Sequence, residues 1–100
     1  MSGKVKEFLR YEFNCRMFEH YINRFKKAVG KFDIDKTSRY YGKTMQYGKK
    51  ALELSKLIEG LPTKDLEDMI QLTEEFHDEA IYPLIRMEAA RMTREAFKRL

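Results

Sequence analysis

Apolar side chains recur every three or four residues along this chain, and this spacing constrains the fold more than any other sequence feature. In the first stretch the recurring positions are Phe8, Tyr11, Cys15, Phe18, Ile22, Phe25 and Val29. A helix turns once in about 3.6 residues, so this spacing places all seven side chains on one helix face. The sequence therefore predicts a helix near residues 4–29 that stops at Gly30, because glycine favours helix C-termini.

The same spacing appears in two later stretches. It runs from Tyr40 to Ile58, and again from Leu66 to Met87. We expect helices near residues 38–59 and 64–98. Three residues before the second helix are candidate caps, namely Asp35, Thr37 and Ser38, and Thr63 is the candidate cap of the third.

Three helices joined by short loops favour antiparallel neighbours. Two valines and six isoleucines among 100 residues provide few of the β-branched side chains that a sheet prefers. The predicted fold is therefore all-α, a single domain over residues 1–100, built as an antiparallel three-helix bundle. Pro83 interrupts the third helix and either kinks it or turns the chain back, which gives a four-helix bundle as the alternative.

Composition argues against a membrane protein or a disulfide-stabilised one. No apolar run approaches the roughly 20 residues that cross a bilayer. The single cysteine, Cys15, has no partner within the chain for a disulfide. We therefore expect no membrane association and a reducing, cytoplasmic location.

Glu74 and His77 have the Glu-x-x-His spacing that presents two ligands to one metal ion. A di-iron bundle needs two such motifs together with carboxylates from other helices, and this chain has one copy. His77 also falls on the apolar face of the third helix. We interpret it as a core histidine that is hydrogen-bonded to a side chain such as Tyr47, and we expect no metal and no cofactor.

No pattern in the sequence indicates catalysis. Cys15 lies on the apolar face of the first helix, where burial raises the pKa of the thiol and makes it unreactive. The chain has no glycine-rich phosphate loop and no zinc-ligand spacing. We therefore expect a protein that is not an enzyme.

Charge is distributed unevenly along the chain. Residues 1–58 contain fourteen basic residues (Lys and Arg) and six acidic residues (Asp and Glu). Residues 59–79 contain one basic and eight acidic residues, and residues 80–100 contain five basic and two acidic residues. The basic segment 36–50 also contains three tyrosines, which suits phosphate neutralisation beside base stacking. One alternative function is therefore nucleic-acid binding, and another is binding of a small anion or nucleotide at an oligomer interface. The possible nucleic-acid contacts are Lys36, Arg39, Lys43, Lys49, Lys50, Arg91 and Arg94.

The third helix is predicted to be longer than its neighbours. At about 1.5 Å per residue, residues 64–99 reach about 54 Å, against about 33 Å for the second helix. The end that projects still carries apolar side chains, which do not stay in water unpartnered. We therefore expect a subunit interface of at least roughly 1,000 Å². Its predicted residues are Leu84, Met87, Met92 and Phe97.

The function that follows is binding to protein partners. We expect a small helical interaction protein, such as a regulator, an inhibitor or an assembly subunit, which forms a homodimer or higher oligomer and also binds another protein. An isologous dimer suits a helix that projects at one end, because the same surface is buried twice.

Overall fold

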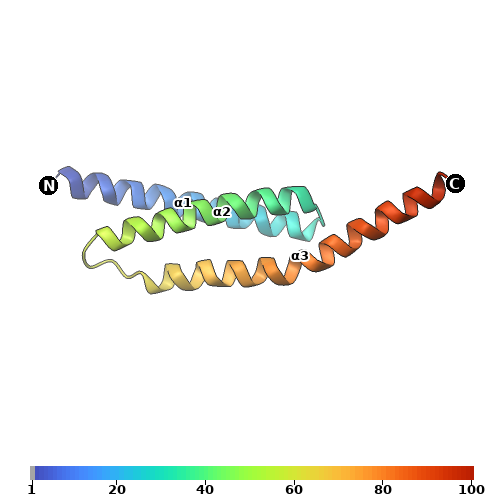
Figure 1. Ribbon diagram of the computed structural model, residues 1–100. Coiled ribbons are helices and arrows are strands. Elements are labelled where there is room, and N and C mark those ends of the chain that lie inside the picture. The colour runs from blue at the N-terminus through green and yellow to red at the C-terminus, as the bar shows by residue number, and fades with distance from the viewer. Residues whose placement is uncertain (1) are drawn as a thin grey trace.

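The computed structural model describes residues 2–100 and shows three helices, α1 (Ser2–Gly30), α2 (Ile34–Leu57) and α3 (Lys64–Lys98). They run up, down and up, with no strand in the described part of the chain (Figure 1). The molecule measures 70 × 21 × 15 Å. The predicted all-α three-helix bundle is confirmed.

α1 ends at Gly30, as predicted, but Gly30 is not the residue that adopts the left-handed conformation. The left-handed residue of the α1–α2 junction is Phe32, with φ of 57°. The amide of Phe32 donates to the carbonyl of Val29, and the amide of Asp33 donates to the carbonyl of Ala28. This is a Schellman arrangement, in which glycine is the usual left-handed residue because it has no Cβ. A phenylalanine therefore occupies a position that strains its backbone.

α2 begins four residues earlier than predicted, at Ile34, and its cap is Asp33. Asp33 is extended, and its carboxylate accepts a hydrogen bond of 3.0 Å from the amide of Lys36. The predicted cap Thr37 instead lies inside the helix and is fully buried. The prediction was wrong because several polar residues in a row can all cap, and packing against α1 selects one of them.

The α2–α3 junction agrees with the predicted break. α2 ends at Leu57, and Gly60 has a φ of 88°, a conformation that glycine adopts without strain. Thr63 is the N-cap residue of α3 but its side chain makes no capping hydrogen bond. The chain therefore turns here through Gly60. The Thr63 hydroxyl does not accept a hydrogen bond from a backbone amide in the first turn of α3.

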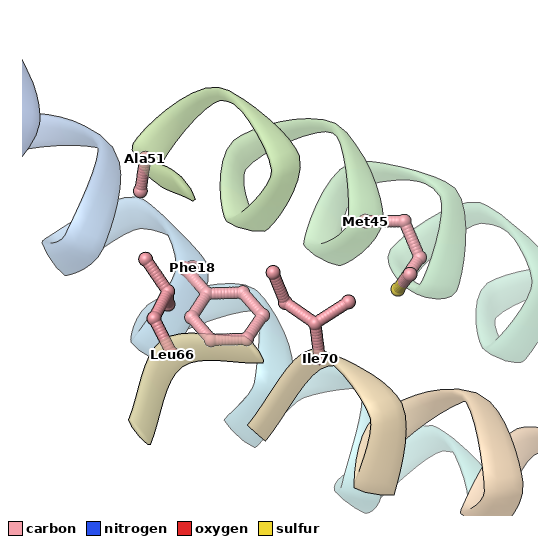
Figure 2. Close-up of a cluster of buried hydrophobic side chains, with 5 residues drawn as sticks. All are labelled: Phe18, Met45, Ala51, Leu66 and Ile70. Carbon is pink, nitrogen blue, oxygen red and sulfur yellow. The ribbon is translucent and has the colours of Figure 1, made fainter. Parts of the chain in front are cut away.

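The core forms where the three helices meet. Phe18 of α1, Met45 and Ala51 of α2, and Leu66 and Ile70 of α3 are all buried (Figure 2). α1 and α2 pack closely along their length, whereas α3 packs mainly against α2 and touches α1 sparingly. This unequal packing leaves a valley between α1 and α3.

Gly48 lets these helices approach one another. A Cβ at this position would lie 2.8 Å from Cε1 of Phe18 and 3.2 Å from Cγ1 of Ile70. Phe18 and Ile70 are 2% and 8% exposed, so both side chains are packed on most sides. A larger residue at Gly48 would therefore have to displace the Phe18 ring or move α2 away from its neighbours.

α3 continues through Pro83 as one helix of 35 residues. The chain does not turn back, so the four-helix alternative is not the observed fold. Figure 1 shows that the second half of α3 changes direction and extends beyond the α1–α2 junction. Every residue from Ala89 to Leu100 is exposed. We call residues 85–100 the C-terminal arm. No helix in the described part of the chain has the length and apolar character needed to cross a membrane.

Candidate interaction surface

An exposed and mostly apolar stripe follows one side of α3. Its positions step by three, four or seven residues, so they share one helix face. The stripe consists of Met69, Leu72, Phe76, Pro83, Met87, Ala90, Arg94 and Phe97, all of which are exposed. Its first half lies beside α1 and its second half lies on the C-terminal arm. We call this set the α3 stripe.

Two of the predicted interface residues lie outside this stripe. Leu84 is 4% exposed, so it is already covered within a single chain and offers little surface to a partner. Met92 is 60% exposed, but five residues from Met87 and from Phe97 it points about 140° away from each of them. Met87 and Phe97 are 47% and 70% exposed and share the stripe. The four residues therefore do not form one surface.

The valley between α1 and α3 contains two adjoining grooves that share Met69. The larger is about 440 Å³ and lies nearer the arm. Its lining is Ile22, Phe25, Lys26, Met69, Leu72, Thr73, Glu75, Phe76 and Glu79. The other, of about 310 Å³, is lined by Tyr11, Cys15, Phe18, Glu19, Pro62, Asp65, Leu66 and Met69. We call the two together the α1–α3 groove.

The α1–α3 groove has an apolar floor and acidic edges. Four carboxylate residues line it, namely Glu19, Asp65, Glu75 and Glu79, against a single cation, Lys26. Apolar side chains are nevertheless open to solvent there, since Leu72 is 63% exposed and Phe76 is 43% exposed. This combination of an apolar floor and negative edges favours a helix that is apolar on one side and basic at its flanks.

Sequence reasoning missed the groove, although a signal for it exists. Met69, Leu72 and Phe76 step by three and four residues beside the predicted inward face of the third helix. A second apolar stripe beside the first indicates burial against a further partner. The groove itself depends on how far α3 lies from α1, and this distance cannot be obtained from either helix alone.

His77 is partly buried, and its partner is not the predicted one. Its ring stacks on Tyr41, with 3.8 Å between ring centroids and 10° between planes. Nδ1 of His77 lies 3.2 Å from Oδ1 of Asp78. Tyr47 instead stacks on Tyr21 of α1. The prediction of Tyr47 was wrong because the Tyr47 ring lies against α1, and Tyr41 is the tyrosine of α2 that faces His77.

The surroundings of His77 are acidic and aromatic. Burial raises the pKa of Tyr41, and the nearby carboxylates of Glu74 and Asp78 raise it further. Among the residues that the structure describes, no group of three His, Cys, Asp or Glu side chains is placed to hold a metal ion. Glu74, His77 and Asp78 therefore lie around Tyr41, but these three side chains are not placed to hold one metal ion together.

Cys15 is partly buried on α1, where it lines the α1–α3 groove. Burial raises the pKa of its thiol, a hydrogen bond with Tyr11 lowers it, and Glu12 and Glu19 raise it again. A thiol in such surroundings is held in its protonated, unreactive form at neutral pH. This placement agrees with the sequence interpretation of Cys15 as a residue of the apolar face.

The predicted nucleic-acid residues do not form a single surface. Lys36, Lys43 and Lys50 are seven residues apart and share one side of α2, whereas Lys49 lies on another side. Lys50 is paired with Glu53 at 3.6 Å.

Arg39 and the two candidate arginines of the arm differ in their contacts. The guanidinium of Arg39 lies 5.8 Å from the Tyr40 ring centroid. Arg91 pairs with both Glu88 and Glu95, which satisfies most of its donors within α3. Arg94 has no ion pair within the described structure. Arg94 therefore keeps its charge available to a partner.

A basic cleft lies instead at the α1–α2 junction. It holds about 130 Å³ and combines four cations with Tyr40 and the capping residue Asp33. The cations are Arg24, Lys27, Lys31 and Lys36. Arg24 also lies 5.8 Å from the Tyr40 ring centroid. Three of these four cations come from the first helix or the loop after it, so the segment 36–50 alone did not indicate the cleft.

No family model, curated protein or solved structure matches this chain.

Proposed function

We propose that this protein works by binding other protein chains, its own copies first, and that the α3 stripe is the binding surface. The observation that carries this proposal is the C-terminal arm, a helix that projects from the bundle with Met87 and Phe97 exposed on one side. Burying such a side chain contributes about 1.5–3 kcal/mol, so a partner that covers the stripe stabilises the complex. A role as regulator, inhibitor or assembly subunit fits a binding surface without catalytic groups.

The proposal is tested by measuring mass in solution as a function of concentration. Sedimentation of the wild-type chain should give a species heavier than the 12.0 kDa monomer at micromolar concentration. Changing Met87 and Phe97 together to aspartate should return it to monomer, because two charges would be buried in an apolar interface.

The matched control is Met92→Asp, which adds the same charge to the same arm on another face. This variant should associate like the wild type. A wild-type chain that sediments as a monomer throughout would refute the proposal. Equal loss of association in Met92→Asp would show that the stripe is not the surface used.

A second candidate function rests on the basic cleft. Arg24, Lys27, Lys31 and Lys36 gather around one small hollow, which suits the phosphate groups of nucleic acid or of a small anionic ligand. Tyr40 borders the cleft and offers a ring beside these charges. The cleft lacks the polar face of a base-reading helix, so binding there should depend weakly on sequence.

We also propose the cytoplasm as the site of action. Cys15 is a free thiol in a partly buried position, and a reducing compartment keeps it so.

A further inference from the structure

The C-terminal arm and the α1–α3 groove lie on the same molecule, but the arm cannot reach the groove of its own chain. α3 is one continuous helix, and the arm extends away from the first half of α3 (Figure 1). That first half lines the groove, so the arm cannot fold back onto it. None of the three described helices fills the groove of its own chain, and the arm of a second copy is the candidate that we consider. The features of the arm and of the groove support this candidate.

The lengths of the two features match. The groove follows α3 from Asp65 to Glu79, fifteen residues or about 22 Å of helix. The helical part of the arm, residues 85–98, is fourteen residues or about 21 Å long. One arm can therefore lie along most of the groove.

The charges also match. The groove is edged by Glu19, Asp65, Glu75 and Glu79. The cations of the arm are Arg86, Arg91, Arg94, Lys98 and Arg99, against Glu88 and Glu95. Arg91 already pairs with both of those glutamates, so the arm presents its other cations to a partner. Opposite charges across an interface favour the intended partner and its orientation.

Seven of the eight positions of the α3 stripe are placed symmetrically about Pro83. Met69 and Phe97 lie fourteen residues on either side of it, Leu72 and Arg94 lie eleven, and Phe76 and Ala90 lie seven, whereas the counterpart of Met87 is Glu79. A two-fold axis beside Pro83, with two copies of α3 antiparallel, therefore brings most of the stripe of one copy opposite the stripe of the other. A surface that is complementary to itself under a two-fold rotation is the requirement for an isologous dimer.

We infer that the arm of a second copy occupies the α1–α3 groove, with the two α3 helices antiparallel about a two-fold axis at Pro83. This inference rests on the proposed self-association and specifies its partner surface. The arm of each chain then packs in the groove of the other chain, so both grooves are filled at once. In this arrangement Phe97 of each copy lies close to Met69 of the other.

The test uses two charge-reversed variants. The groove variant carries Glu75→Lys and Glu79→Lys, and the arm variant carries Arg86→Glu and Arg94→Glu. All four positions are exposed, so circular dichroism should show unchanged helix content. Each variant alone should dissociate at concentrations at least about tenfold above the wild type, because each pairs like charges between arm and groove.

Mixing the two variants should restore the dimer. In the mixed dimer the unaltered arm meets an unaltered groove, and the reversed arm meets a reversed groove, so both contacts are again between opposite charges. Sedimentation of the mixture should give twice the 12.0 kDa chain mass. A dimer formed by pairing arm with arm predicts instead that the groove variant associates like the wild type.

Three results separate failure of this inference from failure of the proposed function. A wild-type chain that stays monomeric overturns both. A wild-type dimer with an unaffected groove variant overturns the inference and leaves self-association in place. Variants that both dissociate, but do not recover on mixing, also overturn the inference.

Cross-linking gives an independent measurement. In a Cys15→Ser background, Met69→Cys with Phe97→Cys should form a covalent dimer with a short thiol cross-linker. These two positions are twenty-eight residues apart on one helix, about 42 Å, so a short linker cannot join them within a chain. The control replaces Phe97→Cys by Met92→Cys, which faces away from the groove. Equal cross-linking in both pairs, or none in either, would contradict the antiparallel arrangement.

Discussion

Replacing Gly48 with alanine should destabilise the bundle, although alanine is the better helix former. Gly48 lies inside α2, so the change removes the propensity cost of glycine, about 1 kcal/mol. The new Cβ would lie 2.8 and 2.9 Å from two ring atoms of Phe18 and 3.2 Å from Ile70. Forcing a methyl group into a closed core costs about 1–3 kcal/mol. The net change in the free energy of unfolding is therefore a loss of up to about 2 kcal/mol.

Gly42 provides the matched control for the gain in helix propensity. It is in the same helix and exposed, and a Cβ there would meet nothing within 4 Å. Gly42→Ala should therefore stabilise the protein by about 1 kcal/mol. The propensity gain is common to both variants, so the difference between them, about 1–3 kcal/mol, measures the packing around Gly48 alone.

Thermal unfolding followed by circular dichroism measures this difference. For a domain of this size, 1 kcal/mol corresponds to a Tm change of roughly 4–8 °C. All proteins should be compared at one concentration, because self-association makes Tm depend on concentration. If Gly48→Ala raises Tm as much as Gly42→Ala does, the close approach of α1, α2 and α3 at Gly48 is not present in solution.

Two further predictions concern the α1–α2 junction. Phe32→Gly should raise the free energy of unfolding by about 1 kcal/mol, because glycine adopts the left-handed conformation without a Cβ clash. A denaturant titration that shows a loss of stability would contradict the Schellman arrangement. If the basic cleft binds nucleic acid, changing Lys27, Lys31 and Lys36 to glutamate should abolish binding to DNA or RNA at about 50 mM salt, whereas Lys49→Glu should weaken it little. A wild-type protein that does not bind at this salt concentration ends that hypothesis.

The spacing of apolar residues determined most of the secondary structure. All three helices follow from steps of three and four residues. Phe18 and Phe25, both on the predicted face of α1, are 2% and 1% exposed. Helical periodicity is a local property, because residues within two turns of one another define it, and so one sequence is sufficient to find it.

The details of helix ends needed the tertiary structure. The sequence predicts that α1 stops at Gly30, and it does, but the left-handed residue of the junction is Phe32. Asp33 caps α2, although three other residues nearby have capping side chains. Packing between α1 and α2 fixes the direction of the junction, and this direction decides which residue adopts which backbone conformation.

The candidate site depended still more on how the helices pack. The sequence indicated that the end of α3 would project, and Met87 and Phe97 are exposed on that end. It could not tell that Leu84 is buried within one chain or that His77 stacks on Tyr41. The groove between α1 and α3 exists because α3 packs mainly against α2. Each helix face is set by local spacing, but the rotation and separation of helices are set by the fit of all three together, with Gly48 determining how closely they approach.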